Sequence, residues 1–232
     1  SIVHEIRRFE RLDSTNDYVL RNVRQLKSGT VVMAGFQSAG KGTQGRDWVS
    51  DAHQNLLFSL YYKDAPFTGL PLFSLRIALG LAQVLLENGL SPQIKWPNDL
   101  IVDDKKIAGI LIEVQDKNCV VGIGLNINQQ VFPADLTLPA TSLADQLGKS
   151  FEPVGVLLKV LDALDDVLTW DDTKVLSRYR SLLYQKGMVR IVTFNGEQFP
   201  ATIVDIDTDG ALVVRDALNK IFRLHSKAML EE

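Results

Sequence analysis

Polar and charged side chains stand at the ends of short apolar runs in the segment from residue 95 to residue 128. The runs 101–102, 107–112 and 120–127 are short enough to form buried strands. The polar residues that flank them are Lys95, Asn98, Asp99, Lys106, Glu113, Asn126 and Asn128. Groups of this kind are costly to bury without partners. We therefore expect them to be paired with one another or to line a site.

A glycine-rich loop, residues 37–48, has a spacing that two nucleotide-binding motifs share. Its glycines satisfy the pattern G-x-G-x-x-G at Gly40, Gly42 and Gly45. The dinucleotide fingerprint must open a helix, but residues 47–51 lack helical apolar spacing. A protein kinase would also carry H-R-D and D-F-G triplets, and the chain has neither. Both of these motif assignments therefore fail.

What remains is a loop between predicted strands at 30–36 and 55–62, with the cations Lys41 and Arg46 among its glycines. Backbone amides and cations in such a loop suit phosphate groups. A flexible hairpin loop without a ligand is the alternative, and the loop alone does not decide between them.

A helix is predicted to open at residues 13–17 and to run to about Leu26. Ser14, followed three residues later by Asp17, is a variant of the capping box. Ser14 then caps the helix, or Ser14, Thr15 and Asn16 point into a ligand pocket. Unpaired amides at a helix N-terminus suit carbonyl or ureido oxygens, so both roles stay open at this point.

The other elements predict an α/β domain followed by a small all-β domain. A first strand is expected at 2–9, and helices are expected at 72–88, from 141–143 onward, at 153–170 and at 173–185. Short strands follow at 188–194, 197–204, 211–215 and 220–224, with hairpin turns at Asn195-Gly196 and Asp209-Gly210. These elements predict two domains, 1–185 and 186–232. The second is too small to be stable unless it docks on the first.

Composition excludes several function classes. The chain has 232 residues, 46% hydrophobic and 23% charged, and its net charge of -3 disfavours a dedicated nucleic-acid binder. The single cysteine, Cys119, excludes an internal disulfide and fits a reducing compartment, which we take to be the cytoplasm. It opens an apolar run, so core packing is expected. Neither a zinc-ligand spacing, a membrane-spanning run nor a signal-peptide pattern is present.

Three motifs together resemble the catalytic core of the biotin protein ligases. They are Lys-Trp-Pro-Asn-Asp at 95–99, Lys-Lys-Ile-Ala-Gly-Ile-Leu-Ile-Glu at 105–113 and Gly-Ile-Gly-Leu-Asn-Ile-Asn at 122–128. The resemblance extends from Phe9 to Leu230. It implies a central mixed β-sheet flanked by helices, as in class II aminoacyl-tRNA synthetases, and a C-terminal SH3-like barrel. It also implies a short form without the N-terminal DNA-binding domain, so we expect no sequence-specific DNA binding.

The resemblance implies that biotin is activated by ATP, as Mg²⁺-ATP, and then attached to a lysine of a biotin carboxyl carrier protein. The central lysine of the family is matched by Lys106, which should lie between the biotin carboxylate and the α-phosphate, while Lys105 is solvated. Asp99 would orient Mg²⁺-ATP, as a weak metal ligand, or accept the charge of the incoming lysine. The catalytic candidates are thus Lys106, Asp99 and Lys41.

The family also implies which residues bind each substrate. The biotin candidates are Ser14, Thr15, Asn16, Gln37, Gly40, Lys41, Gly42, Thr43, Lys106 and Gly109. The ATP candidates are Lys41, Arg46, Trp48, Lys95, Asn98, Lys106 and Asn126. We expect Trp48 and Trp96 to build pocket walls. The loop departs from the family, because Lys41 and Thr43 replace its usual arginines and Gln44 replaces a basic residue.

Two other functions compete with a biotin ligase. One is a lipoate or octanoate ligase or transferase, whose catalytic fold is related, and the other is a non-catalytic biotin-binding regulator. The motifs at 14–16 and 95–99 favour biotin, because a ureido ring needs hydrogen bonds that an acyl chain does not. The presence of Lys106 and Asp99 argues against a regulator. Family members often pair through the central sheet, so we expect a possible homodimer, with residues 119–128 as the edge.

Overall fold

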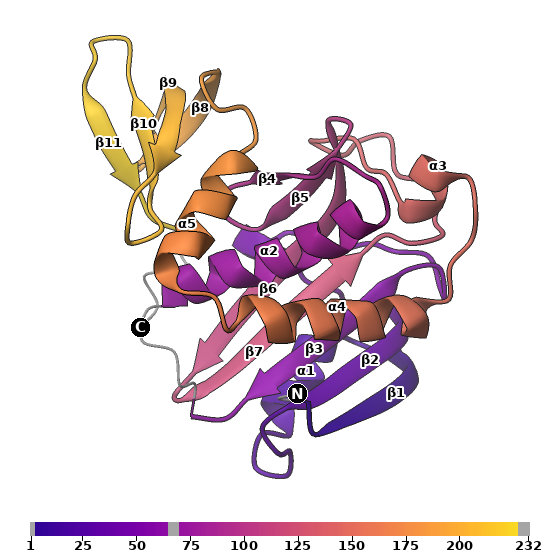
Figure 1. Ribbon diagram of the computed structural model, residues 1–232. Coiled ribbons are helices and arrows are strands. Elements are labelled where there is room, and N and C mark those ends of the chain that lie inside the picture. Colours follow the sequence, from indigo (N-terminus) through magenta and orange to yellow (C-terminus); the bar gives the residue numbers. More distant parts are fainter. Residues whose placement is uncertain (1–2, 65–69, 227–232) are drawn as a thin grey trace.

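Two β-sheets and five α-helices make up the part of the chain that the computed structural model describes, residues 3–64 and 70–226. The larger sheet has seven strands in the order β1-β2-β3-β7-β6-β5-β4 (Figure 1). Its strands are β1 (Glu5–Leu12), β2 (Thr30–Gln37), β3 (Leu56–Tyr62), β4 (Gln93–Lys95), β5 (Asp99–Val102), β6 (Lys105–Gln115) and β7 (Asn118–Leu125). Only β1 and β2 pair in parallel, so this sheet is mixed, as predicted.

Helices cover both faces of the large sheet. Helices α2 (Leu70–Glu87) and α4 (Pro153–Val167) cross the face turned to the viewer in Figure 1, where their apolar side chains join the main core. Helix α1 (Thr15–Arg21) packs with Val19 against Val32, Tyr61 and Val120 in a second apolar cluster. The remaining helices are α3 (Leu143–Leu147) and α5 (Asp172–Ser181). The predicted α/β architecture is confirmed.

Tight turns connect β5 to β6 and β6 to β7, so these strands pair as neighbours in the sheet. Asp103 and Asp104 join β5 to β6 with φ angles of 55° and 57°. This left-handed backbone is available to aspartate at modest cost and suits a two-residue hairpin. Asp116, between β6 and β7, also has a positive φ of 56°. Both connections are therefore tight turns, which their aspartates favour.

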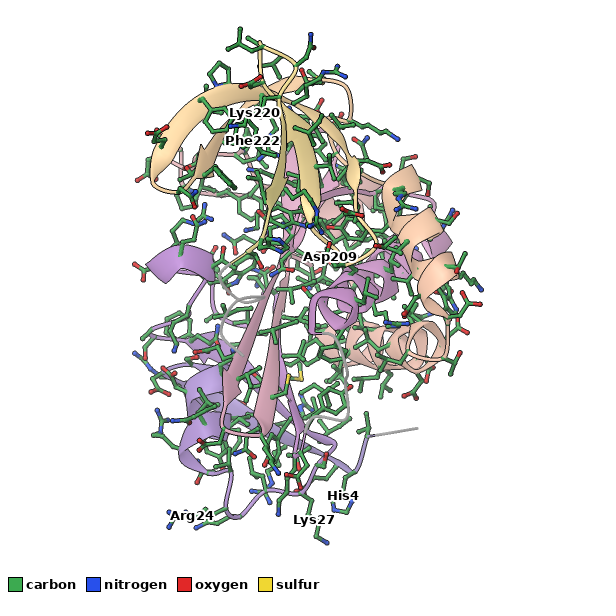
Figure 2. All side chains as sticks on the ribbon, turned by 90° about the vertical axis from the view of Figure 1, so that its left-hand side faces the viewer. His4, Arg24, Lys27, Asp209, Lys220 and Phe222 are labelled. Atoms are coloured by element: carbon green, nitrogen blue, oxygen red, sulfur yellow. The ribbon has the colours of Figure 1, made fainter. Side chains whose placement is uncertain are left out.

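A four-stranded antiparallel sheet follows at the C-terminal end, in the order β11-β10-β9-β8. Its strands are β8 (Val189–Phe194), β9 (Glu197–Ile206), β10 (Leu212–Arg215) and β11 (Ile221–Leu224). Figure 2 shows this small sheet at one end of the molecule, with Lys220 and Phe222 on it, and His4, Arg24 and Lys27 at the opposite end. The division into domains 1–185 and 186–232 stays a prediction, and residues 1–2, 65–69 and 227–232 of those ranges lie outside the described residues.

Two connections hold the small sheet against the large one: the segment between α5 and β8 pairs with β4, and Trp96 bonds the turn between β9 and β10. Ile94 N donates to Leu182 O over 2.7 Å, and Tyr184 N donates to Ile94 O over 2.9 Å. The Trp96 indole Nε1 donates to Gly210 O over 3.0 Å. The interior side chains of the small sheet also belong to the main apolar core. This docking supplies the support that so small a sheet needs.

Three sequence-based expectations need correction. Strand β7 lies between β3 and β6, so residues 119–128 do not form a free edge, and the edges are β1 and β4. Helix α1 ends at Arg21 rather than near Leu26, because the Asn22 side chain bonds Tyr18 O. Helix α5 ends at Ser181, after which the chain pairs with β4 instead. Cys119 is fully buried, as expected, and burial raises the pKa of its thiol to about 12.

None of the described helices combines the length and the apolar content that a membrane crossing requires.

Candidate functional site

A cavity lies where the start of α1, the glycine-rich loop and the neighbouring strands β6 and β7 meet. Its free volume is about 40 Å³. The residues that line it are Ser14, Thr15, Asn16, Gln37, Lys41, Gly42, Thr43, Trp48, Asp99, Lys106, Gly109, Ile110, Leu111, Gly122, Ile123 and Gly124. A cavity of this size holds a water molecule but not an organic ligand. Some wall must therefore move before a ligand enters.

One end of the cavity is a network of neutral hydrogen-bonding groups. Gln37 Oε1 accepts from Thr15 N over 2.8 Å and from Thr15 Oγ1 over 3.2 Å. The Ser59 hydroxyl lies 2.7 Å from Thr15 Oγ1 and 2.5 Å from Asn16 Oδ1. Ser14 Oγ accepts from Asp17 N at the helix N-terminus, so Ser14 both caps α1 and lines the cavity. This end can donate to and accept from an uncharged polar head group.

Lys41 ties the glycine-rich loop to this polar end. Its Nζ lies 2.6 Å from Asp17 Oδ1 and 3.5 Å from Glu113 Oε2. Glu113 Oε1 also accepts from Asn16 Nδ2 over 2.9 Å. Burial lowers the pKa of Lys41, but the hydrogen bond to Asp17 and the charge of Glu113 outweigh it, so the pKa is raised overall. The loop cation is thus held charged, between two carboxylates.

Glycines form the floor of the cavity and Trp48 lies on them. Gly109 on β6 is the register partner of Gly124 on β7. A Cβ atom at Gly124 would lie 2.5 Å from Trp48 Cε2, and one at Gly109 would lie 2.9 Å from Trp48 Cζ3. A Cβ atom at Gly122 would collide with the Asn16 amide. These glycines therefore leave room for a flat group, which here is the indole of Trp48.

The Trp48 indole Nε1 is buried and has no hydrogen-bond partner among the residues that the structure describes. An unpaired buried donor of this kind costs about 1–3 kcal/mol. The indole thus covers the floor in a position that leaves one polar group unsatisfied. The loop is held in a hairpin beside it, because Trp48 N donates to Gly40 O and Gly42 N donates to Arg46 O.

A cation and a carboxylate mark the other end of the cavity. Lys106 Nζ lies 3.0 Å from Asp99 Oδ1 and 5.3 Å from the centre of the Trp48 ring. Asp99 on β5 and Gly109 on β6 are register partners, which brings the motifs at 95–99 and 105–113 together. The cavity thus runs from a neutral polar end, across an apolar floor, to an ammonium group that an anion could share.

Most of the predicted biotin candidates line this one cavity. The exception is Gly40, which lies just behind it, where a Cβ atom would come within 2.6 Å of Trp48 O. The ATP candidates divide. Lys41, Trp48 and Lys106 line the cavity, whereas Arg46, Lys95, Asn98 and Asn126 do not.

The four ATP candidates outside the lining have different surroundings. Arg46 is exposed and donates to Thr43 O and Oγ1. Asn98 accepts from the buried Ser74 hydroxyl, and Asn126 donates to Thr141 O. Lys95 is half-buried beyond Asp99. The binding roles of these residues stay predictions.

Three site residues escaped the sequence analysis. Gly122 and Gly124 stand two apart on one strand, and that spacing puts both on the same face. The spacing of these two glycines is visible in the sequence, but within the motif at 122–128 it does not by itself predict a cavity floor. Ser59 gave no signal, because it lies inside an apolar run and reaches the site only through the pairing of β3 with β7.

Metal-binding side chains do not gather in this part of the molecule. Over residues 3–64 and 70–226, no group of three or more His, Cys, Asp or Glu side chains is placed to hold a metal ion. Asp99 is the single carboxylate among the cavity-lining residues, and Lys106 already pairs with it. A divalent cation at this site would thus take most of its ligands from a bound phosphate.

A second cavity, of about 570 Å³, lies beside β1 and β2 near the start of α4. It is larger, and at its rim His53 Nε2 lies 3.3 Å from Glu10 Oε2. The buried Asn55 in its wall bonds Gln129 and Ile127. Except for Gly40, the predicted biotin candidates line the smaller cavity, and none of them lines this one.

Comparisons with known proteins find relatives of one family. A model of the Biotin/lipoate A/B protein ligase family matches residues 8–129. The chain is 32% identical over 210 residues to the bifunctional ligase/repressor BirA of Bacillus subtilis, which covers 84% of this chain and 64% of that protein. It is 30% identical over 197 residues to the biotin–[acetyl-CoA-carboxylase] ligase of Mycobacterium tuberculosis, covering 79% and 72%.

Solved structures give the same result over nearly the whole chain. The biotin protein ligase from Aquifex aeolicus in complex with biotin and ATP superposes with a TM-score of 0.86 at 26% identity, covering 95% of each chain. The ligase from Leishmania major in complex with biotinyl-5-AMP superposes with a TM-score of 0.66 at 27% identity. The present chain spans less than two thirds of the Bacillus relative, at 64% of its length.

Proposed function

This chain belongs to the biotin/lipoate A/B protein ligase family, and we propose that it is a biotin protein ligase. In this proposal it joins biotin to the adenylyl group of ATP, releases pyrophosphate, and passes the biotinyl group to a lysine of a biotin carboxyl carrier protein. The relatives whose names state a carboxylase as substrate support this choice of acceptor.

The proposal rests on the order in which polar groups, glycines and a lysine follow one another along the cavity. Thr15, Asn16 and Gln37 at one end suit an uncharged ureido ring, which both donates and accepts hydrogen bonds. The glycine floor then suits a flat, largely apolar body, and Lys106 at the other end suits a carboxylate. An acyl chain such as octanoate has no group that could bond this polar end, so the end would favour biotin over such a chain.

In the first step, an oxygen of the biotin carboxylate attacks the α-phosphorus of ATP. A new C–O–P linkage forms, the bond from the α-phosphorus to the bridging oxygen breaks, and pyrophosphate leaves with that electron pair. Two anions must approach each other, so a fixed cation between them stabilises the transition state. We assign this role to Lys106, with Asp99 holding Lys106 in place or orienting Mg²⁺-ATP. Lys41 becomes a second cation when it leaves Asp17 and Glu113.

In the second step, the neutral amine of the carrier lysine attacks the biotinyl carbonyl carbon. An amide bond forms, the bond to the AMP oxygen breaks, and the amine loses a proton. Asp99 is the carboxylate of the cavity lining that could attract the incoming ammonium group. Trp48 must leave the glycine floor before the first step, and it can then cover the bound molecule.

The test is pyrophosphate exchange into ATP with radiolabelled biotin, lipoate or octanoate as the acid. The proposal expects exchange with biotin and much slower exchange with the two acyl acids. Exchange driven best by lipoate or octanoate would make the chain a ligase for those acids instead. Biotin binding without exchange would make it a binding protein, and transfer to an acceptor is then checked with a purified biotin carboxyl carrier domain.

A further inference from the structure

Two half-buried cations next to the cavity have neither a hydrogen-bond partner nor an ion-pair partner among the described residues. Lys95, at the end of β4, and Arg190, on β8 of the small sheet, are each half-buried. Across the described residues, neither side chain makes a hydrogen bond or an ion pair. Buried cations are normally paired, because burial without a partner is costly. Two adjacent exceptions therefore call for an explanation.

The docking of the two sheets brings these cations together. The chain before β8 pairs with β4 through Ile94, whose backbone bonds Leu182 and Tyr184. Lys95 is the next residue on β4, and Arg190 follows Tyr184 by six residues. Along β8, Arg190 shares the inward face with Val192, whereas Val189 and Ile191 are each 65% exposed. Figure 1 shows the small sheet beside the end of the large sheet that carries β4 and β5.

The charges around Lys95 are unbalanced. Arg190, Lys106 and Arg46 all lower its pKa by repulsion, after burial itself, while Asp99 is the one group that raises it. Asp99 is also the one carboxylate whose charge raises the pKa of Arg190, and it is already paired with Lys106. This end of the site therefore holds excess positive charge, which a multivalent anion would neutralise.

We propose that Arg190 of the small sheet forms, with Lys95, the binding site for the β- and γ-phosphates of the nucleotide and for the departing pyrophosphate. This inference rests on the proposed function, which places the α-phosphate at Lys106. Lys95 is the register partner of Asp99, whose carboxylate pairs with Lys106, so the two cations lie next to Lys106 and outside the lining of the cavity. The planar guanidinium of Arg190 can grip two phosphate oxygens at once.

The experiment compares Arg190→Met with the matched variant Arg215→Met. Both arginines lie on the small sheet, but Arg215 on β10 is exposed. Methionine keeps the apolar stem of the side chain and removes only the charge. We expect Arg190→Met to raise the KM for ATP and for pyrophosphate by about tenfold to a hundredfold. Arg190→Lys should recover part of the loss, and Arg215→Met should behave as the unchanged chain.

Three further readouts separate a phosphate-binding role from a structural one. Biotin affinity and the transfer of biotin from supplied biotinyl-adenylate to a carrier should not change, because neither involves pyrophosphate. The thermal unfolding midpoint of Arg190→Met should stay equal or rise, since an unpaired, half-buried charge is removed. A lower midpoint together with an unchanged KM for ATP would overturn the proposal and make Arg190 a structural residue.

Direct binding of ATP and pyrophosphate, measured by calorimetry without biotin, separates this proposal from the proposed function. Weaker binding to Arg190→Met than to Arg215→Met supports the site even if no biotin-dependent exchange occurs. Equal binding to both variants overturns the site even if the chain proves to be an active biotin ligase. Binding of neither anion to the unchanged chain overturns it as well.

Discussion

Lys106 is the residue on which the proposed chemistry depends most directly. Its ammonium lies 3.0 Å from the Asp99 carboxylate in the cavity, whereas its neighbour Lys105 is not among the lining residues. Alternation along β6 explains the difference, since successive side chains point to opposite faces of a strand. Two lysines adjacent in sequence thus form a natural pair of test and control.

We predict that Lys106→Ala reduces biotin-dependent pyrophosphate exchange by roughly 100-fold or more, as removal of a group that stabilises developing charge does elsewhere. Biotin binding should fall much less, because the hydrogen bonds of Thr15, Asn16 and Gln37 remain. Exchange and binding are measured side by side, with Lys105→Ala expected to match the unchanged chain. Exchange at an unchanged rate in Lys106→Ala would show that its assigned role is wrong.

Lys95 gives the site a pH dependence. Burial lowers the pKa of its ammonium below 10.5, and Arg190, Lys106 and Arg46 lower it further, against the opposing effect of Asp99. The neutral amine no longer attracts phosphate, so the KM for ATP should rise as pH increases through this lowered pKa. The free energy of unfolding without nucleotide should rise with pH over the same range, because between the lowered pKa and that of an unfolded lysine the unfolded chain binds the extra proton.

The measurement is the KM for ATP from neutral pH to about pH 10, where an ordinary lysine is still charged. Arg190→Met should move the alkaline rise to higher pH, because it removes a repelling charge. Lys95→Arg should remove the rise in this range, because a guanidinium does not titrate there. A profile that is the same in all three proteins would mean that Lys95 does not contact the nucleotide.

Among the elements, the glycine-rich loop departs most from the family pattern. Lys41 and Thr43 stand where the resemblance predicts arginines, and the structure shows which groups each of them contacts. Lys41 pairs with Asp17 and Glu113, and Thr43 accepts from the exposed Arg46. The loop cations are thus bonded within the protein. A ligand gains their charge only if they leave these partners.

We predict that this chain releases biotinyl-adenylate faster than a Lys41→Arg, Thr43→Arg double variant. Each arginine adds a planar guanidinium that can bind two oxygens. This should stabilise the bound adenylate by about 1.5–3 kcal/mol where the guanidinium is desolvated, and by less in an exposed loop. Adenylate release is followed by stopped flow, together with unspecific labelling of lysines on a bystander protein. If the double variant releases the adenylate at an equal or higher rate, backbone amides rather than side-chain charge hold it.

The elements also show what the sequence could predict. Periodicity and turn chemistry located nearly every strand and helix, because Asp103-Asp104 and Asn195-Gly196 take the positive φ that hairpins need. Strand order could not be read in this way. Strand β7 pairs with β3 and β6, and β3 is far from it in sequence. The prediction that residues 119–128 form a free edge is therefore wrong. The same non-local pairing brings Ser59 into the site, and the docking of β8 brings Arg190.

At the scale of the whole molecule, the edges of the large sheet limit how two copies could associate. The edge strands are β1 and β4, and residues 182–184 already pair with β4. Strand β1 carries Arg8 and Glu10 on its exposed side, and charges there discourage edge-to-edge pairing. The homodimer stays a prediction, and a dimer through β7 is excluded. The absence of sequence-specific DNA binding also stays a prediction.

The docking of the small sheet on the rest of the molecule is the last feature at this scale, and the side chains of Trp96 and Arg180 bond it. Trp96 Nε1 donates to Gly210 O over 3.0 Å. Arg180 on α5 donates to Ile206 O through Nε over 3.0 Å and through Nη2 over 2.7 Å. Figure 2 places Asp209, next to Gly210, at the end of the small sheet that faces the rest of the molecule. If the small sheet carries part of the phosphate site, loosening these bonds should weaken nucleotide binding from a distance.

We predict that Trp96→Phe and Arg180→Met each lower the unfolding free energy by about 1–2 kcal/mol. Amide hydrogen exchange should become faster in β8–β11 and stay slow in β3 and β7, because docking is lost before the large sheet opens. Both variants should raise the KM for ATP while biotin affinity stays constant, and Arg178→Met, on the exposed side of α5, serves as the control. Equally faster exchange in both sheets would mean that they unfold as one unit, and an unchanged KM for ATP would separate the small sheet from the nucleotide.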